Sequence, residues 1–180
     1  ENGDEIKLST GGDGNAFFRL FGYYEGADVV SGDYFDFRKL DEDHYVMIKM
    51  DISGHGLLAS LIMFQVAALY VDYFHRVRIE AEATGRLKFD LRDFIFRIND
   101  LINEVGYSGR FAAFTLSVMN VRTSEYEMIH AGDNIVRIFD SKTKKMKSIT
   151  LVEAPAAGMV ESWMIRPEMY QVVKGKLNRG

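Results

Sequence analysis

Two aspartates, Asp33 and Asp51, lie where apolar, strand-like runs begin or end, and each has glycines close by. Asp33 belongs to the stretch 31–36 (SGDYFD), and Asp51 opens the stretch 51–56 (DISGHG). Carboxylates at strand ends suit hard divalent cations and the phosphate oxygens that such cations hold, and glycines let the main chain approach a ligand. A single aspartate beside a glycine commonly does no more than cap a turn. The pair, with its flanking residues, favours a metal site for phosphoryl chemistry.

The elements that position these aspartates follow from the apolar periodicity. Alternation predicts a hairpin of strands 33–40 and 45–52 around the acidic turn 41–43, so both carboxylates can reach one rim of a sheet. Spacings of three and four residues predict helices over 57–78 and 91–105, the second capped by Asp90. Further strands are expected at 17–24, 111–118, 126–130, 135–139, 146–151 and 169–173. This order of strands, two helices and strands favours an α+β antiparallel fold.

The composition is that of one globular domain. The chain has 180 residues, 47% of them hydrophobic, a net charge of −4 and no cysteine. These values give no reason to expect a nucleic-acid partner and exclude disulfides and cysteine nucleophiles. The polar residues 1–15 are predicted to be a linker or disordered start, and 16–180 the folded domain. The most apolar run, 57–71, is shorter than a membrane span of about 20 residues, so we expect a soluble domain without membrane contact.

An alternative reading of the glycine-rich turn is a dinucleotide-binding fingerprint. Gly54, Gly56 and Ala59 have the required spacing after a strand and at the start of a helix. However, Asp51 would place a negative charge near the pyrophosphate, and the preceding strand belongs to a hairpin instead of a βαβ unit. We therefore disfavour a dinucleotide site. The histidines His44, His75 and His130 lack metal-protease spacing and are expected in turns or on the surface.

Five segments, in this order along the chain, carry a resemblance to a known family: SGDYFDF (31–37), DISGHGLLASLIM (51–63), FTL (114–116), HAGDN (130–134) and PAAG (155–158). The ordered set resembles the bacterial SpoIIE-type branch of the metal-dependent protein phosphatase 2C (PPM) family. It is far more specific than any one of its motifs and extends over nearly the whole chain from residue 17. The resemblance implies a four-layer αββα sandwich, in which two antiparallel sheets lie face to face with helices outside.

The resemblance also implies a chemistry and roles for particular residues. The family hydrolyses phosphoserine or phosphothreonine on proteins with two Mn²⁺ or Mg²⁺ ions and without a covalent phospho-enzyme. By this resemblance Asp51 would bridge both ions, the Ile52 carbonyl would bind one of them, and Asp33 would hold a metal-bound water. Gly32, Gly54, His55 and Gly56 would shape the site, and Asp133 and Asn134 would lie on its substrate side. Members commonly act on anti-sigma-factor antagonists and end sensor proteins, which implies a phosphoprotein substrate, an upstream sensor and a cytoplasmic location.

Two features of the chain depart from the family pattern. Asp133 stands where the family has a histidine, which adds negative charge beside the site. After a segment like 176–180, family members continue into a strand ending in Asp-Gly and later supply another aspartate, and these two carboxylates complete one metal site. The chain is therefore expected to lack its last strands, to bind metal weakly and to have little activity, with exposed sheet edges that favour a homodimer. The alternative is a catalytically degenerate phosphatase fold used for binding or dimerisation; the residues after Gly180 in the gene product would discriminate between the two.

Overall fold

The computed structural model describes residues 3–8, 18–23, 30–106, 109–133, 135–149 and 151–178. Its strands are β1 (Gly3–Leu8), β2 (Phe18–Tyr23), β3 (Tyr34–Lys39), β4 (His44–Ile52), β5 (Ala112–Asn120), β6 (Glu125–Ala131), β7 (Arg137–Asp140), β8 (Lys145–Ser148) and β9 (Val173–Lys176). Two α-helices, α1 (Gly56–Thr84) and α2 (Leu91–Val105), separate β4 from β5, and two short 3₁₀ turns (Ser162–Met164 and Pro167–Met169) precede β9.

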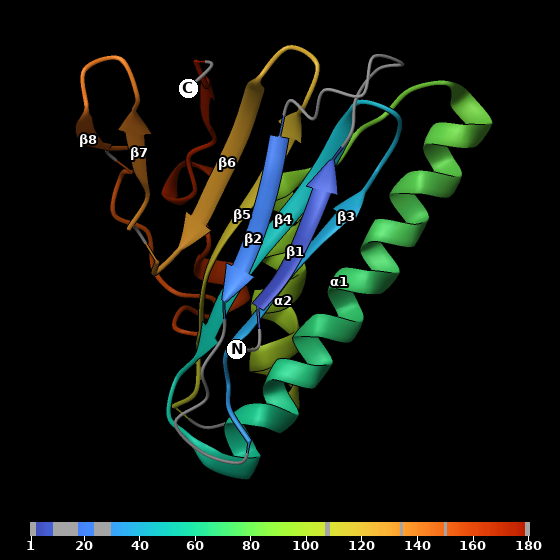
Figure 1. The fold of residues 1–180 in the computed structure, drawn as a ribbon. Helices are drawn as coiled ribbons and strands as arrows, with labels where there is room; N and C mark the ends of the chain where they lie inside the picture. Colours follow the sequence, from blue (N-terminus) through green and yellow to red (C-terminus); the bar gives the residue numbers. More distant parts are fainter. Residues whose placement is uncertain are drawn as a thin grey trace.

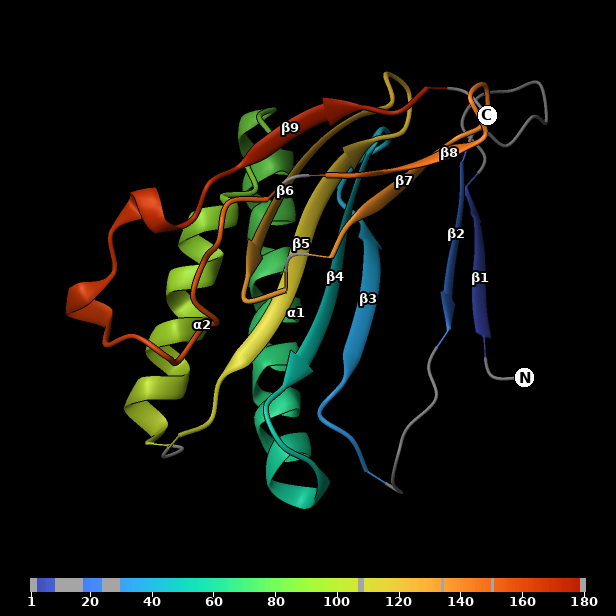
Figure 2. The ribbon, with the colours of Figure 1, turned by 90° about the vertical axis from the view of Figure 1, so that its left-hand side faces the viewer.

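The central element is a five-stranded antiparallel sheet in the order β3-β4-β5-β6-β9. The helices α1 and α2 lie along one face of this sheet, and the β1–β2 hairpin lies over the other (Figures 1 and 2). The small antiparallel sheet β7–β8 packs on that second face as well. The predicted α+β antiparallel fold is confirmed. Within the described ranges three of the four expected layers are seen, because both α-helices lie on the same side.

The larger core fills the space between the sheet and the helices. Alternate residues of β4, from Val46 to Ile52, are buried toward the helices, whereas Lys49 and Asp51 project from the other face. Helix α2 presents its buried apolar stripe to the same core, and the predicted cap is present, since the Asp93 N–H donates to Asp90 Oδ1 at 3.1 Å. The alternation of β4 therefore places its single acidic residue, Asp51, outside the core.

Helix α1 is long and apolar enough, by length and composition alone, to cross a membrane. It also contributes buried side chains to the core along most of its length, from Ala59 to Val77. One side of α1 therefore packs in the core, whereas apolar residues on the rest of its surface, including Leu57, Leu61 and Phe64, are exposed. The helix is longer than the predicted helix 57–78, because an Arg78–Glu82 ion pair stabilises a further turn and Gly85 ends the helix in a left-handed conformation (φ 68°).

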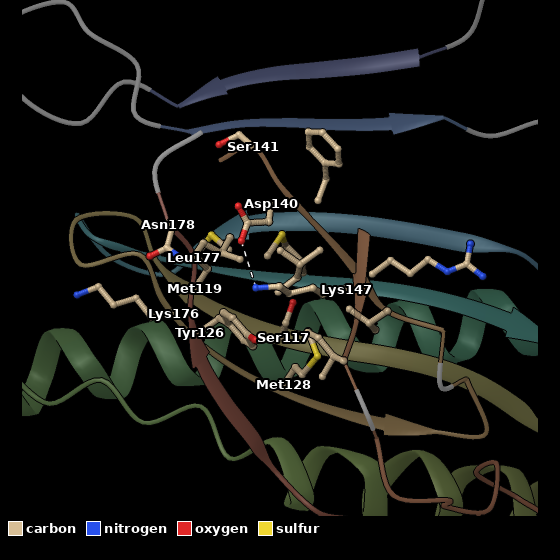
Figure 3. A pocket seen from close by; sticks show the side chains of 16 residues that line it. Ser117, Met119, Tyr126, Met128, Asp140, Ser141, Lys147, Lys176, Leu177 and Asn178 are labelled. Atoms are coloured by element: carbon tan, nitrogen blue, oxygen red, sulfur yellow. Dashed lines mark hydrogen bonds and ion pairs between the residues drawn. The ribbon is translucent and has the colours of Figure 1, made fainter. Parts of the chain in front are cut away.

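A second apolar cluster lies between the other sheet face and the β7–β8 hairpin. It borders a half-open cavity of about 500 Å³, whose lining includes methionines, Tyr126, Asp140 and Lys147 (Figure 3). Asp140 accepts hydrogen bonds from the backbone of the hairpin turn and pairs with Lys147 Nζ at 3.1 Å. Its carboxylate is thus committed to the turn, and none of the predicted site residues lines this cavity.

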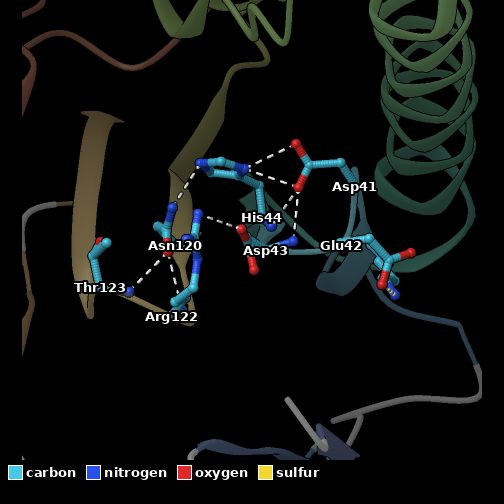
Figure 4. Close-up of polar contacts among 8 residues, drawn as sticks. Asp41, Glu42, Asp43, His44, Asn120, Arg122 and Thr123 are labelled. Carbon is cyan, nitrogen blue, oxygen red and sulfur yellow. Dashed lines mark hydrogen bonds and ion pairs between the residues drawn. The ribbon is translucent and has the colours of Figure 1, made fainter. Parts of the chain in front are cut away.

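Two hairpin tips are tied together at the end of the sheet remote from Asp51. Asp41 accepts from the backbone N–H groups of Asp43 and His44 and contacts the His44 ring at Nδ1 (Figure 4). The other ring nitrogen of His44 lies 3.0 Å from Asn120 Nδ2. Asn120 Oδ1 in turn accepts hydrogen bonds from the backbone N–H groups of Arg122 and Thr123, in the turn after β5. The expected turn role of His44 is confirmed. His130, expected in a turn or on the surface, is instead buried on β6, where its Nε2 bonds the Val152 carbonyl at 2.7 Å.

Three predictions about the chain's elements need correction or remain open. Residues 3–8, assigned to a linker, form strand β1 paired with β2, because Ile6 and Leu8 alternate with charged residues in a strand-like pattern. The last strand is 173–176 instead of 169–173, since Pro167 favours a 3₁₀ turn over 167–169. The domain boundary at residue 16 stays a prediction.

Candidate active site

Asp51 lies near the end of β4, an inner strand of the sheet between β3 and β5. It lies opposite Ala113 of β5, and its side chain is exposed on the face away from the helices. The next residue, Ile52, is completely buried on the helix side. This alternation aims the Asp51 carboxylate at solvent. Pairing with β5 holds its backbone on one side, whereas the pairing with β3 ends one residue earlier, at Met50. A carboxylate on such a support is well positioned to bind a ligand.

The loop 31–33 brings Asp33 to the same place. The Gly32 carbonyl accepts a hydrogen bond from the Ile52 N–H at 3.3 Å. A Cβ atom at Gly32 would lie only 2.9 Å from the Ile52 carbonyl oxygen and 3.2 Å from Ala59 Cβ, so only glycine lets the loop lie this close to β4 and α1. Ser31 then fixes Asp33, whose backbone N–H donates to Ser31 Oγ while that hydroxyl donates to Asp33 Oδ2, both at 3.2 Å.

The two predicted carboxylates interact directly. Partial burial, the charge and hydrogen bond of Asp33, and the charge of Asp133 raise the pKa of the Asp51 carboxyl, while Lys49 opposes the shift. Burial is the largest cause of this rise, and the remainder reflects the negative charges of Asp33 and Asp133 near Asp51. A cation bound between Asp33 and Asp51 would relieve that repulsion, which is the electrostatic condition expected of a metal site.

The turn after Asp51 is fixed by the start of β5. The Ser53 N–H donates to the Phe111 carbonyl and the Phe111 N–H to Ser53 Oγ, both at 2.9 Å. Arg110 Nη1 donates to the Ser53 carbonyl at 2.8 Å and lies over Gly54, whose φ is +86°. His55 is the exposed N-cap residue of α1 and makes no side-chain capping bond. Gly56 is the first residue of α1. The predicted site-shaping residues therefore form one tight connection between Asp51 and the helix.

We expect Gly54→Ala to distort this connection. Its Cβ would lie 1.5 Å from Arg110 Nη1, and an L-residue at φ +86° is strained. Displacement of Arg110 should lower the melting temperature and weaken Mg²⁺ binding at the neighbouring Asp33–Asp51 site. Gly85→Ala is the matched control, because Gly85 also has a positive φ (+68°) but no atom within 4 Å. The control carries the backbone strain alone, so equal effects of the two variants on Mg²⁺ affinity would contradict this role of Gly54.

Asp133 lies close to the pair, but its own carboxylate is engaged. Its Oδ2 forms a 2.8 Å ion pair with Lys49 and accepts from the Thr115 hydroxyl at 3.2 Å. Asn134, the other residue predicted on the substrate side, lies outside the described residues. Sequence reasoning missed Lys49, Thr115 and Arg110 as neighbours of the site. Lys49 could have been found from the alternation of side chains along a strand. It lies two residues before Asp51 on the same strand, so the two side chains share a face of the sheet.

The segment 155–158 is hydrogen-bonded to the start of β5 and to α2, next to the candidate site. Ala157 exchanges hydrogen bonds with Ala112 at the start of β5, at 2.8 and 3.0 Å. The next residue, Gly158, donates its N–H to the buried Asn99 side chain of α2 at 2.7 Å, and Asn99 Nδ2 donates to the Val160 carbonyl at 3.0 Å. Asn99 thus fixes the loop beside β5. It was missed because it interrupts the apolar stripe of α2 and no pattern shows its partners.

The donors present suit the first ligands of a hard divalent cation. Two carboxylates converge, and the Ile52 carbonyl lies beside the Asp33 loop, whose Gly32 approaches it closely. In the described part of the chain, no group of three or more histidine, aspartate or glutamate side chains is arranged to hold an ion. Asp33, Asp51 and Ile52 are therefore suitable ligands for Mg²⁺ or Mn²⁺, and their roles stay predictions.

The comparison with protein families decides the identity of the fold. Residues 41–177 match the family described as Stage II sporulation protein E (SpoIIE), a match that spans well over half of the chain. The chain belongs to the SpoIIE family. The match includes Asp51, the glycine turn and the Asp133 turn, while Asp33 lies before it. Among curated proteins, none is similar enough in sequence to match.

Solved structures show the same SpoIIE-type fold. The PP2C phosphatase domain with a fragment of the regulatory domain of SpoIIE from Bacillus subtilis has a TM-score of 0.62 at 16% identity, covering 84% of this chain and 39% of that one. The structure of the RsbU and RsbW domains of Rv1364c from Mycobacterium tuberculosis has a TM-score of 0.60 at 17% sequence identity. The match covers 86% of this chain and 38% of that one. The structure of RsbX in complex with magnesium has a TM-score of 0.56 at 16% sequence identity, and the match covers 84% of this chain and 63% of that one. The chain thus spans less than two thirds of the length of each of these structures.

Proposed function

We propose that the protein is a metal-dependent serine/threonine phosphatase that acts on a regulatory phosphoprotein. The observation that carries this proposal is the convergence of Asp33 and Asp51 at the end of β4, in a domain of the SpoIIE family. When bound there, Mg²⁺ or Mn²⁺ would supply Lewis acidity toward water and the phosphoryl group. Asp51 and the Ile52 carbonyl would hold the ions, Asp33 would orient water, and the turn 53–56 would fix the position of Asp51.

We infer the substrate and the cellular setting by analogy with the solved relatives. One solved relative carries a fragment of a regulatory domain, and another carries an RsbW domain beside its RsbU domain. These neighbours support a regulatory phosphoprotein as substrate, such as an anti-sigma-factor antagonist. We further propose an upstream sensor and a role as a cytoplasmic output domain in bacterial signalling.

A second function is favoured by the small number of carboxylates at the site. Only two of the described acidic side chains, Asp33 and Asp51, converge without a salt-bridge partner, because Asp133 is paired with Lys49. A phosphatase fold that has lost metal binding would serve as a binding or dimerisation module, with its exposed sheet edges available for pairing.

The deciding experiment measures hydrolysis by the complete gene product. We expect release of phosphate from a phosphoserine peptide and from p-nitrophenyl phosphate with Mn²⁺ or Mg²⁺, and none with EDTA. Calorimetric titration of Mn²⁺ into the same protein gives a readout independent of turnover. Absence of both metal binding and hydrolysis would reject the phosphatase proposal and leave the binding module.

A further inference from the structure

Lys49 places a positive charge at the edge of the acidic site. It lies two residues before Asp51 on β4, so both side chains project from the same face of the sheet. Its ammonium forms a 2.8 Å ion pair with Asp133 Oδ2, and its positive charge acts to lower the pKa of Asp51 against the opposite effects of burial and the neighbouring aspartates. The ammonium is therefore electrostatically coupled to both aspartates.

Asp133, the ion-pair partner of Lys49, is largely buried and held by a further hydrogen bond. The Asp133 side chain is only 13% exposed. Thr115 faces Lys49 across the β4–β5 register, and its single hydroxyl hydrogen is shared between Asp133 Oδ2 at 3.2 Å and the Asp133 carbonyl oxygen at 3.1 Å. A carboxylate with these bonds is fixed in orientation, and its Oδ2 is already in use. Asp133 is thus suited to hold the lysine in place.

The ammonium itself remains accessible. The Lys49 side chain is 63% exposed and borders an open hollow of about 210 Å³ together with Phe35 and Thr115. Asp133 is its ion-pair partner within the described ranges, and an ammonium has three N–H donors. The ion pair with Asp133 therefore leaves N–H donors of Lys49 available to a ligand. An ion pair that served stability alone would need no such open position, and at this exposure it would contribute little.

A phosphoryl group entering this site would meet three carboxylates, those of Asp33, Asp51 and Asp133. We propose that Lys49 binds an oxygen of that phosphoryl group and that Asp133 is the positioning residue that holds Lys49 for this contact. The inference rests on the proposed function for its substrate, but phosphate binding by Lys49 can be measured without turnover. A charge-assisted N–H···O⁻ contact of this kind is among the stronger hydrogen bonds in proteins.

The test compares Lys49→Met, Lys49→Arg and Asp133→Asn in the complete gene product. Calorimetric titration of inorganic phosphate, with and without saturating Mg²⁺, should show about a tenfold loss of affinity for Lys49→Met, equivalent to about 1.4 kcal/mol. Lys49→Arg should retain most of the affinity, and Asp133→Asn should show an intermediate loss. For p-nitrophenyl phosphate we expect KM to rise by a similar factor with kcat less affected. Lys39→Met, at an exposed ion pair on β3, is the control.

The alternative role of Lys49 is to neutralise the carboxylates without touching substrate. In that case Lys49→Met would change Mg²⁺ affinity and leave phosphate affinity unchanged, a result that overturns the inference. Failure of the proposed function is distinguishable. If no variant hydrolyses phosphate esters but phosphate affinity still falls in the order wild type, Asp133→Asn, Lys49→Met, the binding role of Lys49 stands. If the wild-type protein binds no phosphate, the inference is wrong.

Discussion

Replacing Asp51 with asparagine is expected to abolish metal-dependent hydrolysis, by at least about 100-fold, because the variant loses a charged oxygen ligand where the ions would be held. Mg²⁺ and Mn²⁺ affinity should fall with activity. Calorimetric metal titration and phosphate release measure the two effects separately. Asp72→Asn is the matched control, since Asp72 is an exposed aspartate on α1 paired with Arg76, where little change is expected.

The same Asp51→Asn substitution should make the metal-free protein more stable. A carboxyl whose pKa is raised in the folded state destabilises that state when it is ionised. This destabilisation is fully present above the raised folded pKa of Asp51 and disappears as the pH falls below the ordinary range of an aspartate. The variant should therefore melt at a higher temperature than wild type at neutral pH, and the difference should vanish in acid. Added Mg²⁺ should stabilise only the wild type. An active Asp51→Asn variant would contradict the assigned role.

The largest effect on stability is expected from Phe94→Ala. The Phe94 ring is completely buried and contacts the rings of Tyr70, Tyr73 and Phe89, with centroids 5.9, 5.2 and 6.1 Å away. Its removal leaves a cavity between α1 and α2, which should lower the free energy of unfolding by about 3–5 kcal/mol. The midpoint of urea unfolding, with an unchanged slope, measures this loss.

Two further variants make the Phe94 prediction sharper. Phe64→Ala carries the same chemical change on the exposed side of α1, where 64% of the residue is in contact with solvent, and it should alter the midpoint very little. If Phe94→Ala does not fold, Phe94→Leu retains more of the volume and should unfold at an intermediate urea concentration. Equal midpoints for the Phe94 and Phe64 variants would show that the α1–α2 contact contributes little to stability.

The sequence predicts the scaffold well where periodicity is strong. The hairpin 33–52, the cap at Asp90 and the alternation of β4 are local patterns, and the structure confirms each of them. The strand at 3–8 was missed because glycines and polar residues surround its short alternating pattern. The shift of the last strand to 173–176 depends on a 3₁₀ turn that propensity alone does not fix.

The candidate site was predictable in part. Glycines beside Asp33 and Asp51 mark them as special, but their convergence requires the loop 31–33 to lie against Ile52. The Lys49–Asp133 pair joins residues that are far apart in the chain, and so does the contact of Arg110 with Ser53. Such contacts are created by the pairing of β4 with β5 and of β5 with β6, and a single sequence carries no local signal for them.

The pairing of β4 with β5 has a consequence for folding kinetics. The two strands are neighbours in the sheet, yet the whole helical segment between Ile52 and Ala112 separates them along the chain. Closing such a segment is entropically costly, and folds dominated by distant pairings fold slowly. The Ser53–Phe111 hydrogen bonds lie at the end of this closure, so the Asp51 turn acquires its final shape only when the strands join. Metal ions should therefore slow unfolding without accelerating the early steps of folding.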